Sequence, residues 1–326
     1  LMNKDIFKEL KTNIILILSA IIVGLITSLV TQIFSFTAKK IFDLLKNNED
    51  FEILNVSILG YEGNTLPIFS CIFAAICICM LIKFFKIERW HGPADTIYAA
   101  HQHGGTLNIQ RGFQSTLAAF FSISGGASVG IYGPLVHFGG TLGAFLRRRK
   151  FMPNIPHDIV IGAGVAAAIS AGFSSPIAGI VFAHEVVLRH FSVKAIASIS
   201  LASISSSILA QEIDFVSPPL QFVNIPFELY NAVPGLILTG IFSALVAFIF
   251  MKSLMYHSKI SSSLNLPFCY RPFIPALICG FIGMFLPEVI GLGSETISNI
   301  ITTIHPIQFL LLLLILKIFL SSLCIG

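Results

Sequence analysis

The sequence predicts an all-α polytopic membrane protein that contains broken transmembrane helices. Hydrophobic residues make up 55% of the 326 residues, whereas charged residues make up only 11%. A soluble globular domain carries about 25% charged residues, and a soluble core could not absorb this much apolar surface. The mean hydropathy of +0.87 supports the same fold class. A lipid bilayer is therefore the environment that we expect for this chain.

Several apolar stretches approach or reach the length of about 20 residues that crosses the hydrocarbon core of a bilayer. They cover residues 14–36, 66–82, 193–209, 236–251 and 307–326. Shorter apolar blocks, interrupted by Gly, Pro and Ser, lie at residues 117–123, 159–170 and 177–188. Broken helices at membrane depth occur where they are buried in protein or line a cavity. This pattern is typical of a channel or transporter and argues against a simple membrane anchor.

The chain is expected to contain two related parts. Residues 1–212 form the first part, residues 213–229 a linker, and residues 230–326 the second part. Each part has a short segment that opens a helix after an apolar span, at residues 91–97 and 293–297. Paired broken segments in corresponding positions indicate an inverted repeat with a binding site between its halves. The second part is shorter and ends within an apolar run, so we expect an incomplete repeat.

The sequence argues against several other classes of protein. Its six cysteines form no Cys-x-x-Cys pair and mostly lie within apolar runs, so we interpret them as small packing residues. His101 and His103 lack an evident third ligand, so no metal site is predicted. The chain has no nucleophile–base pair and no phosphate-binding loop with lysine, so we predict neither an enzyme nor a cofactor. The net charge of +4 does not require a nucleic acid partner.

The most informative stretch is the Gly-rich run 124–137, which reads Ser-Gly-Gly-Ala-Ser-Val-Gly-Ile-Tyr-Gly-Pro-Leu-Val-His. Glycine permits close approach of the backbone, and Pro134 suits an early position in a helix, so the run predicts a loop that leads into a helix N-terminus. The unpaired N–H groups and the dipole at such an end attract an anion without a charged side chain, and partial charges let it leave again. Alternatively, the run is a helix-packing loop of small residues.

Four sequence blocks occur in the order that one family of membrane proteins has them. The first is Trp90-His91-Gly92-Pro93, at the place of that family's G-S-G-I-P half-helix, and the second is Gly130-Ile131-Tyr132-Gly133-Pro134, which resembles G-[KR]-E-G-P. Residues 167–182 resemble A-A-x-F-x-A-P-[IL]-A-G-x-x-F, and residues 317–326 resemble the run that leads to G-[IV]-F-x-P. On these blocks the chain resembles the CLC family of chloride channels and transporters.

The resemblance implies a CLC-like inverted repeat of tilted and broken transmembrane helices, with the second repeat truncated. It implies a multi-pass integral protein of a bacterial-type inner or plasma membrane. It also implies an anion site that is formed by His91, Gly92, Gly130, Ile131, Tyr132, Gly133 and Pro134.

Two positions of this implied site depart from the family. The family's central serine falls at His91, whose imidazole could donate a hydrogen bond to an anion or could simply cap a short helix. The family's gating glutamate falls at Tyr132. A phenol with an ordinary pKa of about 10 stays neutral near pH 7, so Tyr132 cannot cycle charge as a carboxylate does. We expect Tyr132 to be a gate that either donates a hydrogen bond to the anion or narrows its path.

The resemblance implies an inner vestibule at Glu185 and Val186. The proton-transfer glutamate of family exchangers falls at Val186, which cannot carry a proton; a register shifted by one residue would assign Glu185 instead. Glu185 otherwise has a structural or vestibule role. Arg189, four residues further along, could pair with Glu185 on one face of a helix.

We therefore predict transmembrane transport of chloride or a similar small anion through a pore formed by helix N-termini. Because Tyr132 and Val186 replace both carboxylates, we expect transport without proton coupling. The alternatives are a coupled anion/proton secondary transporter and a non-conducting truncated membrane fragment. Residues 180–188 and 193–209 stand where the family forms its dimer contact, so we expect a homodimer with one pore per subunit. The expected partners are the anion, the lipid bilayer and a second copy of the chain.

Overall fold

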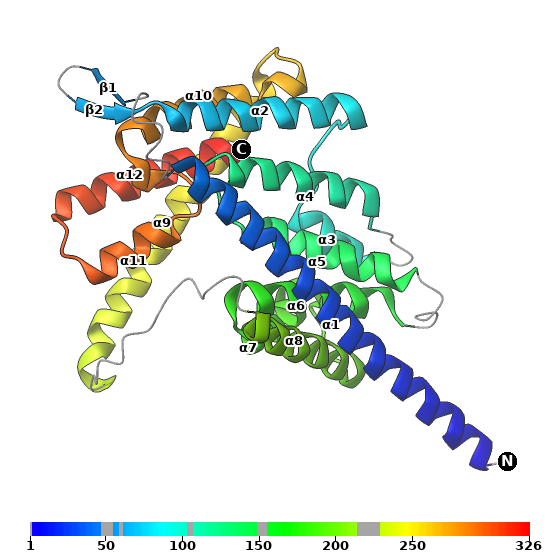
Figure 1. Cartoon of the computed structure of the whole chain (residues 1–326). Coiled ribbons are helices and arrows are strands. Elements are labelled where there is room, and N and C mark those ends of the chain that lie inside the picture. Colours follow the sequence, from blue (N-terminus) through cyan, green and yellow to red (C-terminus); the bar gives the residue numbers. More distant parts are fainter. Residues whose placement is uncertain (1, 47–54, 59–60, 103–106, 149–154, 214–228) are drawn as a thin grey trace. The chain divides into compact units, whose positions relative to one another are not determined.

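The computed structural model describes residues 2–46, 55–58, 61–102, 107–148, 155–213 and 229–326 of the chain (Figure 1). Helices form most of this part. In chain order the elements are α1 (Met2–Lys46), β1 (Asn55–Ile58), β2 (Tyr61–Asn64), α2 (Leu66–Phe85), α3 (Pro93–His101), α4 (Ile109–Ser124), α5 (Tyr132–Arg147), α6 (His157–Phe173), α7 (Pro176–Phe182), the π-helix η2 (Ala183–Leu188), α8 (Val193–Ile213), α9 (Leu229–Ser263), the 3₁₀-helix η3 (Phe268–Tyr270), α10 (Phe273–Phe285), the 3₁₀-helix η4 (Pro287–Val289), α11 (Ser294–Thr302) and α12 (Ile307–Ile325).

Six helical segments of the described chain are long and apolar enough to cross a membrane. Five of them coincide with or contain the stretches predicted from the sequence, to within one residue, in α1, α2, α8, α9 and α12. The sixth, Phe268–Phe285, combines η3 with α10 and overlaps the apolar span that was expected before residues 293–297. The shorter apolar blocks lie in α4, α6 and the α7–η2 segment. The predicted all-α polytopic membrane fold is confirmed.

The described residues also contain one small departure from an all-helical fold. Strands β1 and β2 pair antiparallel as a two-stranded hairpin, with Asn55 opposite Asn64 and Ile58 opposite Tyr61. Two sequence-based predictions fall largely on undescribed positions: residues 214–228 of the expected linker and His103 lie outside the described residues.

The chain divides into two compact units, each of which combines segments that are distant in sequence. The first unit contains residues 1–40, 87–120 and 131–218, and the second contains residues 41–86, 121–130 and 219–326. The second unit therefore includes segments from both predicted sequence parts. The repeat boundaries at residues 212 and 230 stay a prediction, because units defined by contacts do not test a repeat.

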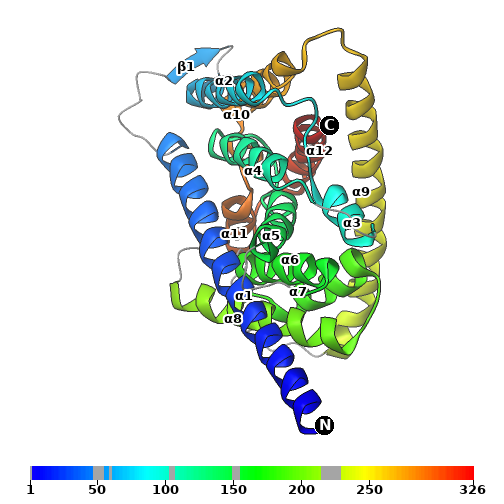
Figure 2. The ribbon, with the colours of Figure 1, turned by 90° about the vertical axis from the view of Figure 1, so that its right-hand side faces the viewer.

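Helix α6 is the centre of the first unit. Its residues from Ile159 to Ala171 are all buried, and Figure 2 shows α5 running beside it. The two backbones come close because glycines face each other: a Cβ built on Gly139 would lie 2.4 Å from the carbonyl oxygen of Gly164. Such small-residue contacts are typical of helix pairs in membranes. On another side, the Ser206 hydroxyl of α8 donates to the Ala167 carbonyl of α6 at 2.7 Å.

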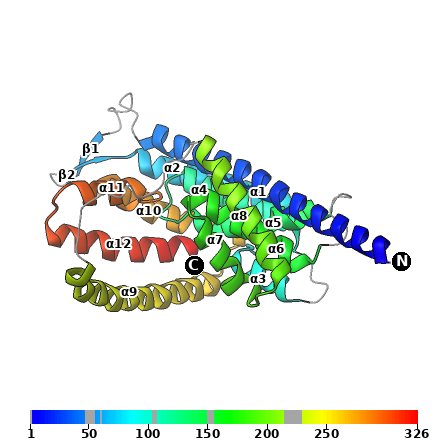
Figure 3. The ribbon, with the colours of Figure 1, turned by 90° about the horizontal axis from the view of Figure 1, so that it is seen from below.

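Two pairs of helices pack most extensively in the described part of the second unit. In the first pair, α2 packs on α10, where a Cβ on Gly280 would lie 2.7 Å from the Cα of Ile68. In the second pair, α9 and α12 run side by side (Figure 3). The Ser253 and Ser322 hydroxyls join them by a hydrogen bond of 2.7 Å. Buried side chains from α2, α10 and α12, among them Cys71, Cys279 and Leu320, form the core of this unit.

Candidate functional site

The start of α5 leaves backbone donors without acceptors inside the helix. Tyr132 is the first residue of α5, Pro134 is the third, and the preceding residue Ile131 provides no side-chain cap. Leu135 is the first residue whose N–H bonds back, to the Ile131 carbonyl at 3.1 Å. The N–H groups of Tyr132 and Gly133 therefore have no intrahelical partner. The first turn also contains no acidic residue, so the positive end of the helix dipole is not compensated there.

The start of α3 differs because a carboxylate occupies it. Gly92 is the cap residue and Pro93 the first helical residue, and the N–H groups of Asp95 and Thr96 bond to the Gly92 carbonyl at 3.0 and 3.3 Å. In return, Asp95 Oδ2 accepts the Gly92 N–H at 2.9 Å. Arg89 donates to Asp95 Oδ1 at 2.6 Å. Most donors at this helix start are therefore already used.

Sequence reasoning missed Asp95, although a signal was present. A carboxylate three residues after a cap position has the spacing of a capping box, in which the side chain reaches back to the cap N–H. Gly92 and Asp95 have this spacing.

The two helix starts are neighbours within the first unit. A Cβ built on Gly133 would have Pro93 Cγ as its nearest neighbour, at 3.9 Å, and a Cβ on Gly92 would meet no atom within 4 Å. Open space therefore borders Gly92, whereas Gly133 is in ordinary van der Waals contact with Pro93. The Thr96 hydroxyl of α3 and Nδ1 of His137 on α5 are 2.7 Å apart and hydrogen-bonded, which fixes the two helices to each other.

Two histidines lie between α3 and α5. The rings of His91 and His137 are stacked, with their centroids 6.4 Å apart and an interplanar angle of 23°. The His91 side chain is 10% exposed and His137 is 2% exposed. The Nε2 atom of each ring is buried and has no hydrogen-bond partner among the described residues. On the other side of the His91 ring, Nδ1 lies 3.4 Å from Asp95 Oδ1.

Tyr132 is half-buried at the first position of α5. Its ring stacks on the ring of Phe173, the last residue of α6, with centroids 3.5 Å apart and an interplanar angle of 16°. The ring is therefore positioned by an aromatic contact beside the unpaired donors of α5.

Glu185 and Val186 lie in the π-helix η2, where Glu185 is exposed and Val186 is partly buried. The expected pairing of Glu185 with Arg189 is wrong: the described residues contain no ion pair between them. Arg189 is the cap residue after η2 and has a left-handed backbone with φ of 56°. The four-residue spacing of an α-helical face therefore does not apply to this pair.

Gly130 ends a loop, residues 125–130, that belongs to the second unit. Other residues of this unit form hydrogen bonds to the backbone carbonyls of the loop. The Cys71 thiol donates to the Gly125 carbonyl at 3.3 Å, and the Gly291 N–H donates to the Gly126 carbonyl at 3.0 Å. Gly126 has a φ of +92°, which glycine tolerates best. The Cys71 contact was missed from the sequence, because it joins residues that are far apart in the chain.

Lys317 is a second feature that sequence reasoning left without a role. Its Nζ on α12 donates to the carbonyls of Val289 and Gly291, at 3.0 and 2.9 Å. Backbone oxygens thus satisfy an ammonium group inside a predicted span, where an unpaired charge would be costly. Gly291 in turn donates to the loop of Gly126, so Lys317 supports the loop indirectly.

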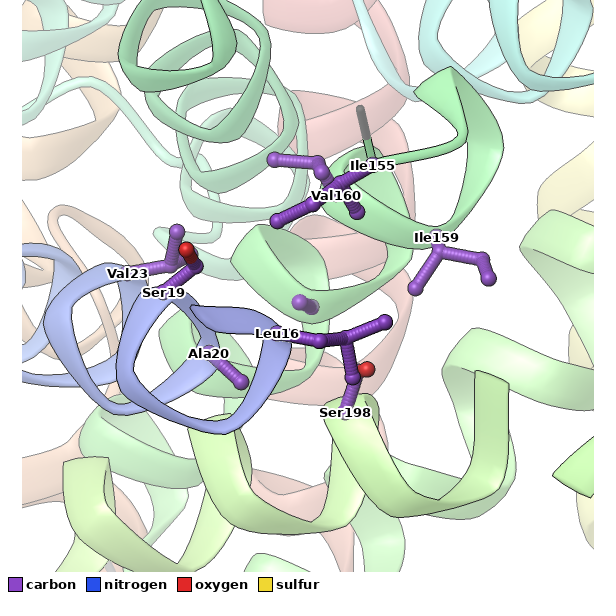
Figure 4. Close-up of a pocket in the computed structure, with 9 residues that line it drawn as sticks. Leu16, Ser19, Ala20, Val23, Ile155, Ile159, Val160 and Ser198 are labelled. Carbon is purple, nitrogen blue, oxygen red and sulfur yellow. The ribbon is translucent and has the colours of Figure 1, made fainter. Parts of the chain in front are cut away.

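A small pocket in the first unit lies apart from these helix starts. Its lining comes from α1, α6 and α8 and from Ile155, which precedes α6 by two residues, and it is mostly apolar (Figure 4). Ser19 and Ser198 provide its only polar side chains. These two hydroxyls are the only side-chain donors in the lining, and no positively charged side chain lies there. Three or more His, Cys, Asp or Glu side chains that could hold a metal do not come together anywhere in the described part of the chain.

Comparison with known proteins places these features in a family context. A family model described as voltage gated chloride channel matches residues 73–326. Relatives include the voltage-gated ClC-type chloride channel ClcB of Escherichia coli O81 (strain ED1a), 23% identical over 311 residues. ClcB of Escherichia coli (strain K12 / DH10B) is 22% identical over 311 residues. Each match covers 94% of this chain and 72% of the relative.

Two solved structures have a similar fold. An X-ray crystal structure of a slow cyanobacterial Cl⁻/H⁺ antiporter has a TM-score of 0.73 at 19% identity, covering 96% of this chain and 75% of that one. A CLC-type fluoride/proton antiporter has a TM-score of 0.70 at 21% identity, covering 94% and 76%. At these identities the similarity shows the fold alone. Because the family model matches most of the sequence, this chain belongs to the voltage gated chloride channel family, whose members are multi-pass membrane channels and transporters of anions rather than enzymes.

Proposed function

We propose that this protein conducts chloride or a similar small anion across the membrane, with the start of α5 as the main anion-binding element and Tyr132 as its gate. The observation that carries the proposal is the uncapped first turn of α5, which has free N–H donors and no acidic residue. Backbone donors and a helix dipole bind an anion moderately, so that it can also leave.

The other residues of the candidate site have supporting positions. Gly92 borders open space, and Pro93, the next residue, is the neighbour of Gly133, so we infer room for an ion near the donors of Tyr132 and Gly133. Tyr132 stacks on Phe173 next to these donors. Ile131, Pro134 and Gly130 shape the backbone that leads into α5.

We further propose that transport is not coupled to proton exchange. Tyr132 and Val186 provide no carboxylate at the two positions where family resemblance implies one. A phenol with an ordinary pKa of about 10 does not change its charge near neutral pH. Coupled exchange is the second candidate function, because the ionisable and exposed Glu185 directly precedes Val186 in η2.

A flux experiment tests both candidates at once. The purified protein is reconstituted in liposomes loaded with chloride, and chloride efflux and proton movement are recorded together. Chloride efflux without proton movement is the expected result. Uphill proton movement driven by a chloride gradient would contradict the uncoupled mechanism, and the variant Glu185→Gln would then show whether Glu185 carries the proton. If folded, reconstituted protein moved neither ion, the non-conducting alternative would replace both.

We also propose a homodimer in which α7, η2 and α8 form the subunit contact. These elements expose large apolar side chains in the described structure, among them Ile177, Val181, Ile204 and Ile208. Cysteine pairs introduced at Ile204 and Ile208 should crosslink two chains in membranes, whereas cysteines on the exposed α9 residues Leu238 and Ile241 should not. Crosslinking at α9 alone would assign the contact elsewhere.

A further inference from the structure

The stacked pair His91 and His137 has a feature that the proposed function does not use. Both rings are largely buried between α3 and α5, and the Nε2 atom of each has no partner among the described residues. A buried nitrogen without a partner is costly unless a ligand or water satisfies it. Open space borders Gly92, the residue next to His91. The free donors of α5 are the N–H groups of Tyr132 and Gly133. Gly133 has Pro93, the residue after Gly92, as its neighbour.

The neighbouring carboxylate determines which His91 nitrogen carries the proton of the neutral ring. Nδ1 lies 3.4 Å from Asp95 Oδ1, so the negative charge favours the tautomer with hydrogen on Nδ1. Nε2 then presents a lone pair, which cannot donate to an anion. From that tautomer, only protonation places an N–H at Nε2, and it also gives the ring a positive charge. An anion at this position therefore requires a proton on His91.

We propose, on the basis of the proposed function, that one anion and one proton bind together at His91, so that anion affinity increases as the pH falls. The anion accepts a hydrogen bond from Nε2 of the imidazolium and from the first N–H groups of α5. No bond other than the N–H bond forms, and the proton comes from water. His91 is thus a specificity-determining residue that makes this anion site dependent on pH.

The charges around His91 support this linkage. Burial lowers the pKa of His91, the Asp95 carboxylate opposes that shift, and Arg89 and Arg111 of α4 reinforce it. His137 on α5 is the other titratable group that faces the ring. The neutral ring is therefore favoured near pH 7. A bound anion adds negative charge beside the ring and raises the pKa of His91, and by linkage protonation strengthens anion binding by the same factor.

A titration of the purified protein with sodium chloride tests the proposal. Chloride affinity is measured calorimetrically at about pH 7.5 and about pH 5.5, on either side of the ordinary histidine pKa of about 6.5. Buffers with different heats of ionisation count the protons taken up. The expected result is tighter binding at the lower pH, by at most about tenfold per pH unit, with uptake of a proton per chloride.

Three variants separate His91 from other titratable groups. His91→Gln keeps a polar side chain that does not titrate and should bind chloride with little pH dependence. Asp95→Asn removes the charge that places hydrogen on Nδ1, so it should tighten binding at about pH 7.5 and flatten the profile. His190→Gln is the control, because His190 pairs with Asp158 on α6 and should keep the wild-type profile.

The outcomes distinguish this inference from the proposed function. Chloride binding without proton uptake, or an unchanged pH profile in folded His91→Gln, would overturn the linkage and leave the anion site of α5 standing. Absence of chloride binding at either pH would overturn both. Loss of the pH profile in His190→Gln alone would assign the linked proton to another site.

Discussion

The starts of α3 and α5 look alike in sequence and differ in chemistry. Each helix has a Gly-Pro pair in its cap or first turn, Gly92-Pro93 in α3 and Gly133-Pro134 in α5, and each lies in the first compact unit. At α3, Asp95 accepts the Gly92 N–H and pairs with Arg89, so the positive helix end is compensated. At α5, the first turn has neither a cap nor an acid. A Gly-Pro helix start is therefore not by itself an anion site. The next few side chains determine whether its N–H donors stay free for an anion.

The largest expected effect comes from giving α5 the carboxylate that α3 has. In Tyr132→Glu, a negative charge at the helix start competes with the anion for the same donors, which is worth up to about 2 kcal/mol. We expect chloride flux at about pH 7.5 to fall about tenfold. Flux from liposomes measures it, and Tyr132→Gln, which has no charge, is the control. Equal flux in the Glu and Gln variants would show that the α5 start does not bind the anion.

The second prediction concerns stability and the hydrogen bond between Thr96 of α3 and His137 of α5. Thr96→Val removes the partner of His137 Nδ1 in a buried position, and an unsatisfied buried polar group costs about 1–3 kcal/mol. The free energy of unfolding, measured by denaturation in detergent micelles, should fall by that amount. Thr116→Val is the control, since the Thr116 hydroxyl donates only within α4, to the Gly112 carbonyl. Similar losses in both variants would mean that the α3–α5 bond has no special importance.

Removal of the α3 cap should destabilise the fold by a smaller amount. Asp95→Ala leaves the Gly92 N–H and Arg89 without their acceptor, and loss of a capping interaction costs about 1 kcal/mol. The comparison variant is Asp158→Ala, because Asp158 also lies in a first helical turn but forms only a partly exposed pair with His190. Unfolding in detergent should rank Asp95→Ala as the less stable protein. The reverse order would show that Asp95 does not act as a cap.

The smallest effect is expected for the Tyr132 hydroxyl. Tyr132→Phe keeps the ring that stacks on Phe173 and should change stability by less than about 0.5 kcal/mol. Tyr132→Leu loses the aromatic pair, which is worth about 0.5–1.5 kcal/mol. Comparison of chloride flux in the two variants also shows whether the ring or the hydroxyl controls the path. A strong loss of flux in Tyr132→Phe would identify the hydroxyl as an anion donor.

Local patterns were sufficient to predict where most membrane helices lie. Apolar runs of about 20 residues located five of the six candidate spans, since a bilayer imposes that length. Residues 268–285 were anticipated only as an apolar span before residues 293–297, because the apolar run of α10 is short and η3 extends it with Phe268–Tyr270. The Gly-Pro pairs marked the starts of α3 and α5 for a local reason, since proline is accommodated in the first turn of a helix.

The electrostatic surroundings of the candidate site were harder to predict. The partners of His91 come from three separate segments: Asp95 on α3, Ser115 on α4, whose hydroxyl accepts the His91 N–H at 2.9 Å, and His137 on α5. Only Asp95 is close in sequence. Contacts between distant segments depend on packing of the whole unit, and no local periodicity encodes them.

The π-helix η2 also explains why the register of Glu185 and Val186 was ambiguous from sequence. A π-helical turn contains one residue more than an α-helical turn, and the Arg189 N–H accordingly reaches back five residues, to the His184 carbonyl at 2.8 Å. Deletion of one residue within Ala183–Leu188 would therefore convert the turn to an ordinary α-helix without breaking the chain's path. Such a deletion would therefore change which side chain this segment presents at a given place.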